Sequence, residues 1–181
     1  MQDARDMDHP ANETAVDWRP MLHENLSAVN AVADRVHVDY PEDEAVLAER
    51  LSLYPEGCLS LWRGGSIVGY LVSHPWHFKQ PPALNVLLEK IPSPASTYYV
   101  HDIALLPAAR GTGAASAAVS RIVKHATEAG FSNVSLIAVS GSRPFWKRHR
   151  FAVVDDPALG PKLKSYDNRA VFMVLALSGS V

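Results

Sequence analysis

The segment that most restricts the fold of this chain runs from residue 98 to residue 139 and has the pattern strand, glycine loop, helix, strand. Residues 98–106 have a strand pattern that Pro107 ends. From Gly113 onward, apolar residues recur at helical spacing with polar residues on the opposite face, and Gly130 is placed to end the helix. The apolar stripe consists of Ala115, Ala118, Val119, Ile122, Val123 and Ala126. Residues 133–139 then predict a buried strand.

The rest of the chain predicts further strands and helices in alternation. Gly64 and Gly65 predict a two-residue hairpin turn between two strands. The predicted strands are residues 16–21, 58–63, 66–74, 98–106, 133–139, 151–155 and 169–177, and the predicted helices are residues 26–36, 41–54, 113–130 and 144–149. This order predicts an α/β (α+β) fold in which a mixed sheet is covered by helices on both faces.

Residues 75–97 separate two of the predicted strands by an unusually long connection. The segment contains five prolines, which limit its freedom in the unfolded chain. It also carries Leu84, Leu87, Leu88 and Ile91, whose spacing predicts a short apolar helical patch. We therefore expect an ordered insertion that folds back onto the protein.

Length and composition indicate one domain over residues 16–181, preceded by a flexible lead at 1–15. The net charge of -2 comes from interspersed charges, which excludes the basic surface of a nucleic-acid binder. No apolar run is long enough for a membrane span, and the polar N-terminus lacks the features of a signal peptide. Cys58 is the single cysteine and is expected to be buried and inert. A cytoplasmic protein is expected.

The loop at residues 107–116 has the composition of a phosphate-binding loop. Its glycines and alanines would let a pyrophosphate approach backbone N–H groups closely. The helix that follows presents unpaired N–H groups and the positive end of its dipole. An ordinary strand-to-helix turn is the alternative that these residues alone leave open.

The pattern Arg110-x-x-Gly113-x-Ala115 resembles the Arg/Gln-x-x-Gly-x-Gly/Ala signature of the GNAT superfamily of N-acetyltransferases. In that family the signature follows a strand and a proline, as it does here. One helix and one strand later comes an aromatic segment that ends in Gly-Phe, which residues 145–151 resemble. The resemblance covers residues 98–151 best and implies a GNAT-type, mostly antiparallel sheet.

The resemblance also implies a cosubstrate, an acceptor and a set of binding residues. The cosubstrate would be acetyl-CoA, with no metal, and the acceptor a small-molecule or peptide amine. A homodimer is the first quaternary state to test, and the insertion at 75–97 would form a wall of the acceptor pocket or pack across a dimer interface. The residues expected to bind CoA are Ile103, Ala104, Leu105, Arg110, Gly111, Thr112, Gly113, Ala114, Ala115, Ser116, Ser140 and Trp146. Among these, the backbone N–H groups of Ile103 and Leu105 would hold the acyl carbonyl and the pantetheine arm.

His101 is the candidate general base, because related acetyltransferases carry Glu or His four residues before the position of Leu105. Imidazole is suited to taking a proton from an amine near neutral pH. Strand alternation predicts Tyr99, His101 and Ile103 on one face and Asp102 on the other. A packed, hydrogen-bonded histidine is the alternative for His101, and a structural role is expected for Asp102.

Two residues depart from the family pattern. Trp146 stands where many members have a tyrosine that serves as general acid, and an indole N–H cannot donate a proton usefully at neutral pH. Water, Ser140, Ser142 or another tyrosine would then protonate the thiolate, or it leaves unassisted. Arg150 replaces the usual glycine before Phe151. These departures leave open a CoA-binding module without catalysis.

Other patterns favour structural readings. Gly111-x-Gly113-x-x-Ser116 is close to a dinucleotide-binding motif, but the acid expected at the end of the next strand is missing. The acidic residues Asp39, Glu42, Asp43 and Glu44 are interpreted as a solvated helix start, with the border of an acceptor pocket as the alternative. The histidines show no convincing metal spacing.

Overall fold

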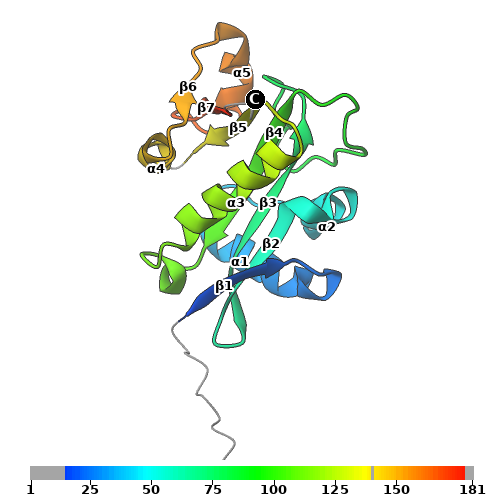
Figure 1. The fold of residues 1–181 in the computed structure, drawn as a ribbon, viewed down its shortest axis with the longest axis vertical. Helices are drawn as coiled ribbons and strands as arrows, with labels where there is room; N and C mark the ends of the chain where they lie inside the picture. Colours follow the sequence, from blue (N-terminus) through cyan, green and yellow to red (C-terminus); the bar gives the residue numbers. More distant parts are fainter. Residues whose placement is uncertain (1–14, 140, 178–181) are drawn as a thin grey trace, which may run out of the picture.

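A computed structural model describes residues 15–139 and 141–177 and contains one seven-stranded sheet in the order β1-β2-β3-β4-β5-β7-β6 (Figure 1). Every neighbouring pair of strands is antiparallel except β4 and β5, which are parallel. The strands are β1 (Val16–Pro20), β2 (Cys58–Arg63), β3 (Ser66–Trp76), β4 (Thr97–Leu105), β5 (Asn133–Ala138), β6 (Ala152–Val153) and β7 (Val171–Ala176). The predicted mixed, mostly antiparallel sheet is confirmed.

Helices cover both faces of the sheet, as predicted. They are α1 (Leu26–Val36), α2 (Glu44–Leu53), α3 (Ala114–Glu128), α4 (Arg143–Arg148) and α5 (Gly160–Lys164). Short 3₁₀ turns occur at His23–Asn25, Pro55–Gly57, Pro107–Ala109 and Pro157–Leu159. In Figure 1, α3 crosses one face of the sheet while α1 and α2 lie on the other.

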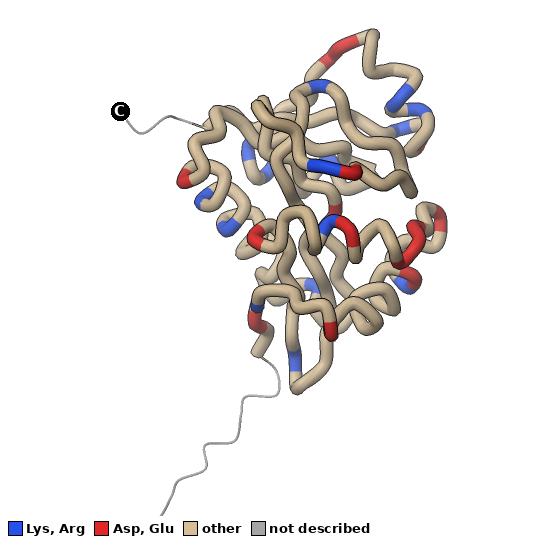
Figure 2. The backbone as a smooth tube through the Cα atoms, turned by 90° about the vertical axis from the view of Figure 1, so that its right-hand side faces the viewer, with Lys and Arg blue, Asp and Glu red and all other residues tan. Residues whose placement is uncertain are grey.

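Charged residues are spread over the molecule. Figure 2 shows Lys and Arg interspersed with Asp and Glu along the backbone of the described residues. Among the described residues, no helix is both long and apolar enough to cross a membrane.

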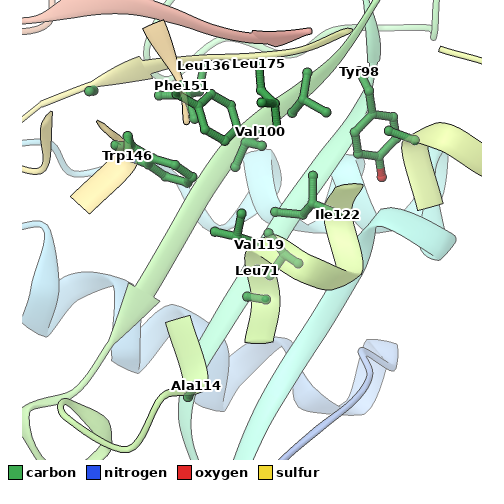
Figure 3. Close-up of a cluster of buried hydrophobic side chains, with 14 of the residues drawn as sticks. Leu71, Tyr98, Val100, Ala114, Val119, Ile122, Leu136, Trp146, Phe151 and Leu175 are labelled. Atoms are coloured by element: carbon green, nitrogen blue, oxygen red, sulfur yellow. The ribbon is translucent and has the colours of Figure 1, made fainter. Parts of the chain in front are cut away.

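Two hydrophobic cores hold the helices to the sheet. Figure 3 shows the larger one, in which Val119 and Ile122 of α3 pack against Tyr98 and Val100 of β4. The second core lies under α1 and α2 and includes Val29, Leu47, Tyr70, Val72 and Ala104. Burying each large apolar side chain stabilises the fold by about 1.5–3 kcal/mol. The apolar stripe of α3 therefore predicts which face of that helix packs on the sheet.

The connection between β3 and β4 is ordered but not helical, so the predicted helical patch at residues 84–91 is wrong. Prolines flank the patch, and Asn85 and Glu89 have the positive φ angles 52° and 64°, which a right-handed helix cannot contain. The sequence reading also missed α5, where Gly160 and Pro161 gave no helical signal.

The insertion at 77–96 has a few hydrogen bonds of its own, such as Phe78 N–H to Ser96 Oγ at 2.8 Å, and is fastened to α2 by further polar contacts. Glu49 accepts hydrogen bonds from the backbone N–H groups of Leu88 and Glu89, at 2.7 and 2.8 Å. The buried Arg50 donates to the carbonyl oxygen of Val86 at 2.7 Å and pairs with Glu49 at 2.5 Å. These polar contacts replace the helical hydrogen bonds that the prolines prevent.

Candidate functional site

The site lies where the two parallel strands separate. β4 and β5 pair only at Tyr98, Tyr99 and Val100, although β4 continues to Leu105 and β5 to Ala138. Beyond Val100, β4 therefore has no strand bonded to its β5 side in the part of the chain that the structure describes. Backbone groups on that side are available to a ligand.

The N–H groups of Ile103 and Leu105 point into this gap. The N–H of Leu106 donates to the carbonyl oxygen of Val68 on the β3 side, at 2.8 Å. In an antiparallel pair the direction of N–H alternates, so Ala104 also faces β3, while Ile103 and Leu105 face β5. The carbonyl oxygen of Leu105 faces the same way and accepts from Arg110 Nε at 3.3 Å.

The loop after β4 presents a helix N-terminus beside the gap, where only the first N–H, that of Ala114, has a side-chain acceptor among the described residues, the hydroxyl of Thr112 at 3.4 Å. Gly113 is the N-cap of α3 and has a φ of 84°, a conformation that favours glycine, and Gly111 has a φ of 76°. The cap has no side-chain hydrogen bond, and the first intrahelical bond is Ala117 N–H to Gly113 O. The amides of Ala115 and Ser116 therefore lack helical acceptors and can bind an anion.

A β-bulge places His101 beside Asp102. The pairing of β3 with β4 shifts between Val72 and Ser73, which leaves His101 as the extra residue of β4. His101 and Asp102 both turn to the α1 and α2 side, where they meet Glu42 and His37, while Ile103 packs with the α3 core. The predicted alternation, with Asp102 opposite His101 and Ile103, is wrong because a bulge adds one residue to the count.

His101 is held by Glu42, which comes from the turn before α2. Their Nε2 and Oε2 atoms are 3.0 Å apart, and their side chains are 7% and 15% exposed. Burial opposes the ionisation of Glu42, but the hydrogen bond and charge of His101, together with the N–H of Asn85 and the charge of Arg50, lower its pKa to about 2. Glu42 is therefore a carboxylate at neutral pH and fixes the imidazole.

Asp102 makes a second carboxylate–histidine pair in the same cavity. Its Oδ2 lies 2.8 Å from His37 Nε2 and accepts a hydrogen bond from the hydroxyl of Tyr70. Burial lowers the pKa of His37, but the hydrogen bond and charge of Asp102 outweigh it and raise the pKa overall. This agrees with the structural role expected of Asp102.

The gap opens into a cavity of about 360 Å³ that passes between the strands. The side near α3 and α4 is lined by Ile103, Leu105, Arg110, Ala115, Phe145 and Trp146. The side near α1 and α2 is lined by His37, Tyr40, Glu42, Leu84, Tyr99 and Tyr166. We call these the phosphate side and the distal side. His101, which pairs with Glu42, lines the distal side as well.

Trp146 offers the cavity an apolar wall. It is 7% exposed and packs edge-on against Phe145, with ring centroids 5.1 Å apart. It also packs edge-on against Phe151, with ring centroids 5.2 Å apart (Figure 3). Arg150, which stands where the family pattern has a glycine, has a φ of 66°. The backbone at the end of α4 therefore keeps the left-handed conformation that this glycine would adopt.

The structure brings most of the predicted site residues together. His101, Ile103, Leu105, Arg110, Ala115 and Trp146 line the cavity, and Gly111, Thr112, Gly113, Ala114 and Ser116 form the adjoining loop and helix start. Ala104 does not line the cavity, because its side chain is buried in the core under α1 and α2. Ser140 lies outside the described residues.

The sequence indicates only part of the distal side. It predicts the insertion as a wall of the acceptor pocket, and Leu84 of the insertion does line the cavity. It favours a solvated helix start for the acidic cluster and gives the pocket border as the alternative; Asp43 and Glu44 are exposed, whereas Glu42 turns into the cavity. His37 and Tyr166 gave no signal, because they are distant in sequence from the motif strand. Pro41, just before Glu42, was the available hint that the chain turns there.

Residues 20–151 match the acetyltransferase (GNAT) family, and the chain belongs to that family. The match covers well over half of the chain and includes β4, the glycine loop, α3, β5 and α4. No curated protein matches the chain in sequence.

Solved structures with the same fold are numerous and distant in sequence. The GNATL loading domain of CurA from Lyngbya majuscula superposes with a TM-score of 0.75 at 13% identity, covering 90% of this chain and 98% of that one. The GphF GNAT-like decarboxylase in complex with isobutyryl-CoA gives 0.68 at 19% identity, covering 90% and 100%. The ribosomal-protein-S18-alanine N-acetyltransferase from Escherichia coli gives 0.64 at 15% identity, covering 92% and 97%. At these identities the likeness establishes the fold.

Proposed function

We propose that this protein transfers an acetyl group from acetyl-CoA to a primary amine by direct attack in a ternary complex. The observation that carries the proposal is the position of His101, which lines the cavity where β4 and β5 separate and is held by Glu42 at 3.0 Å. Membership of the GNAT acetyltransferase family and the CoA-bound relatives of the same fold support it.

Acetyl-CoA would bind on the phosphate side. Its pyrophosphate would accept hydrogen bonds from backbone N–H groups of residues 111–116, where the helix dipole favours negative charge. The pantetheine arm and the thioester carbonyl would meet the N–H groups of Ile103 and Leu105, which face the gap. Donors fixed before the reaction stabilise the charge that develops on the carbonyl oxygen.

His101 would take the proton of the acceptor ammonium, directly or through water. Glu42 is a positioning residue in this scheme, since its carboxylate orients the imidazole and stabilises the imidazolium that forms. The neutral amine then attacks the thioester carbon, a C–N bond forms, the C–S bond breaks, and CoA leaves as the thiolate. The nitrogen loses its second proton as the amide forms, and this release balances the proton that the thiolate takes up.

The thiolate needs a proton from a group other than Trp146. Ser142 lines the cavity and water can reach it, so both are candidates, whereas the hydroxyls of Tyr40 and Tyr166 already donate to Asp167 and to the carbonyl oxygen of Pro82. Burial raises the pKa of Tyr166 to about 12, which makes that phenol a weak acid. Cys58 is fully buried and burial raises the pKa of its thiol to about 12, so no acyl-enzyme is expected.

The test follows CoA release from acetyl-CoA with a thiol reagent across a library of primary amines, together with mass spectrometry of the products. The proposal requires acetylated amine in stoichiometric yield with free CoA. Tight CoA binding without turnover on any amine would favour a CoA-binding module that lacks catalysis, the alternative that Trp146 motivates.

A further inference from the structure

The distal side of the cavity is closed by segments that lie far apart in the sequence. The hydroxyl of Tyr166, just after α5, donates to the carbonyl oxygen of Pro82 in the insertion. The hydroxyl of Tyr40 donates to Asp167 at 3.1 Å. Lys79 of the insertion pairs with Asp156 at 2.9 Å. The insertion, the α5 segment and the turn before α2 therefore meet as one roof.

This roof lies over the inner end of the cavity and leaves little room there. Tyr99 is 3% exposed beneath it, and Leu84 and Tyr166 line the cavity from the roof itself. About 360 Å³ must hold the acyl-pantetheine end as well as the acceptor. A peptide would need an open groove for its second and later residues.

Each histidine of the distal side that could carry a positive charge already has a carboxylate partner. Of the described residues that line the cavity, those with cationic groups are Arg110 on the phosphate side, His101 paired with Glu42, and His37 paired with Asp102. The buried Arg50 is bound to Glu49 and Val86 and does not line the cavity. A carboxylate on the acceptor would find no unpaired cation here, and burying it alone is costly.

The remaining lining is apolar and aromatic. Leu84, Tyr99, Tyr166 and Tyr40 offer ring and methyl surface, while the hydroxyls of Tyr40 and Tyr166 are committed to the roof. We propose that the acceptor is a small primary amine with an apolar or aromatic body and no carboxylate, and that amino acids and peptide N-termini are poor acceptors. This inference rests on the proposed function of the same cavity.

The experiment compares three ligands that share one side chain: 2-phenylethylamine, phenylalanine and the dipeptide Phe-Gly. Each is titrated by calorimetry into the CoA-saturated protein, and each is then assayed with acetyl-CoA. We expect 2-phenylethylamine to bind about tenfold or more tightly than the other two. Equal or tighter binding of phenylalanine or Phe-Gly, or no binding of 2-phenylethylamine, overturns the inference. If 2-phenylethylamine binds selectively but is never acetylated, the inference stands and the proposed N-acetylation fails.

Three variants test the cause of the selectivity. Leu84→Arg supplies the missing cation and should narrow the gap between phenylalanine and 2-phenylethylamine. Tyr166→Ala opens the roof and should improve binding of Phe-Gly, whereas Tyr166→Phe keeps the ring and should retain the exclusion. Leu84→Arg and Tyr166→Ala could both still bind CoA and keep the wild-type preference for 2-phenylethylamine. The roof would then not set acceptor selectivity, and the inference would be overturned.

Discussion

The phosphate side of the cavity is formed mainly by backbone groups, whereas the distal side is formed by side chains. The phosphate side uses backbone groups of a continuous segment, from Ile103 through the start of α3. The distal side uses side chains from four separate segments, represented by Glu42, Leu84, His101 and Tyr166. A binding site formed by backbone groups depends on glycines and on a helix N-terminus, and therefore tolerates substitution of most side chains. A binding site formed by side chains can change its ligand specificity with one substitution.

The largest effect is expected on the distal side, from His101→Ala. If the imidazole takes the amine proton, turnover should fall by about 10² or more while CoA affinity is retained. The loss should be smaller at high pH, where more of the amine is already neutral. Steady-state kinetics over a pH series measure this, with His77→Ala as the control because His77 is exposed. Near wild-type turnover at neutral pH would leave His101 with a structural role.

The phosphate side is tested by Gly113→Val. A branched side chain at a φ of 84° should displace the backbone N–H groups from the pyrophosphate, and CoA affinity should fall by about tenfold or more. Gly65→Val is a matched control, since Gly65 has a φ of 79°, also has open space around its Cβ position, and lies in a distant hairpin. Calorimetric CoA titration of both folded variants decides the assignment. Equal CoA affinities would refute it.

These two sides also differ in what could be predicted from the sequence. The amphipathic stripe of α3 and the glycines before it determine local structure, so the loop and the GNAT-type sheet were predicted correctly. The pairing of Glu42 with His101 depends on a contact across 59 positions and on a bulge at His101. A bulge leaves no mark in the pattern of a strand. The helix predicted within the insertion is wrong for a similar reason. The conformation of the insertion is set by contacts with Glu49 and Arg50, which the local sequence pattern does not reveal.

The pH dependence of stability gives a test of Glu42 that does not rely on catalysis. The pKa of Glu42 is lowered from 4.5 to about 2 in the folded protein, so its stabilising contribution is complete above about pH 4.5 and is lost as pH falls toward 2. That contribution is on the order of 3 kcal/mol at most. Glu42→Gln should therefore lose less stability than the wild type between pH 5 and pH 3, as measured by urea unfolding. Glu44→Gln, an exposed neighbour, should titrate like the wild type, and identical slopes for all three proteins would contradict the pairing.

The smallest expected effect concerns the phosphate side again, at the end of α4. Arg150 has a φ of 66°, which costs a residue with a side chain about 1–2 kcal/mol. Glycine removes that strain but gives the unfolded chain more freedom, worth about 0.4–1 kcal/mol, so Arg150→Gly should stabilise the protein by about 1 kcal/mol, within a range from about 0 to about 1.6 kcal/mol. For a chain of this length the melting temperature should rise by about 2–4 °C, which thermal unfolding can detect. Arg150→Ala keeps the strained backbone and removes the same charge, so it should show no such gain. A rise of equal size in Arg150→Ala would assign the effect to the lost charge. CoA affinity should be unchanged in both variants, because the backbone shape that supports this side is already present with arginine.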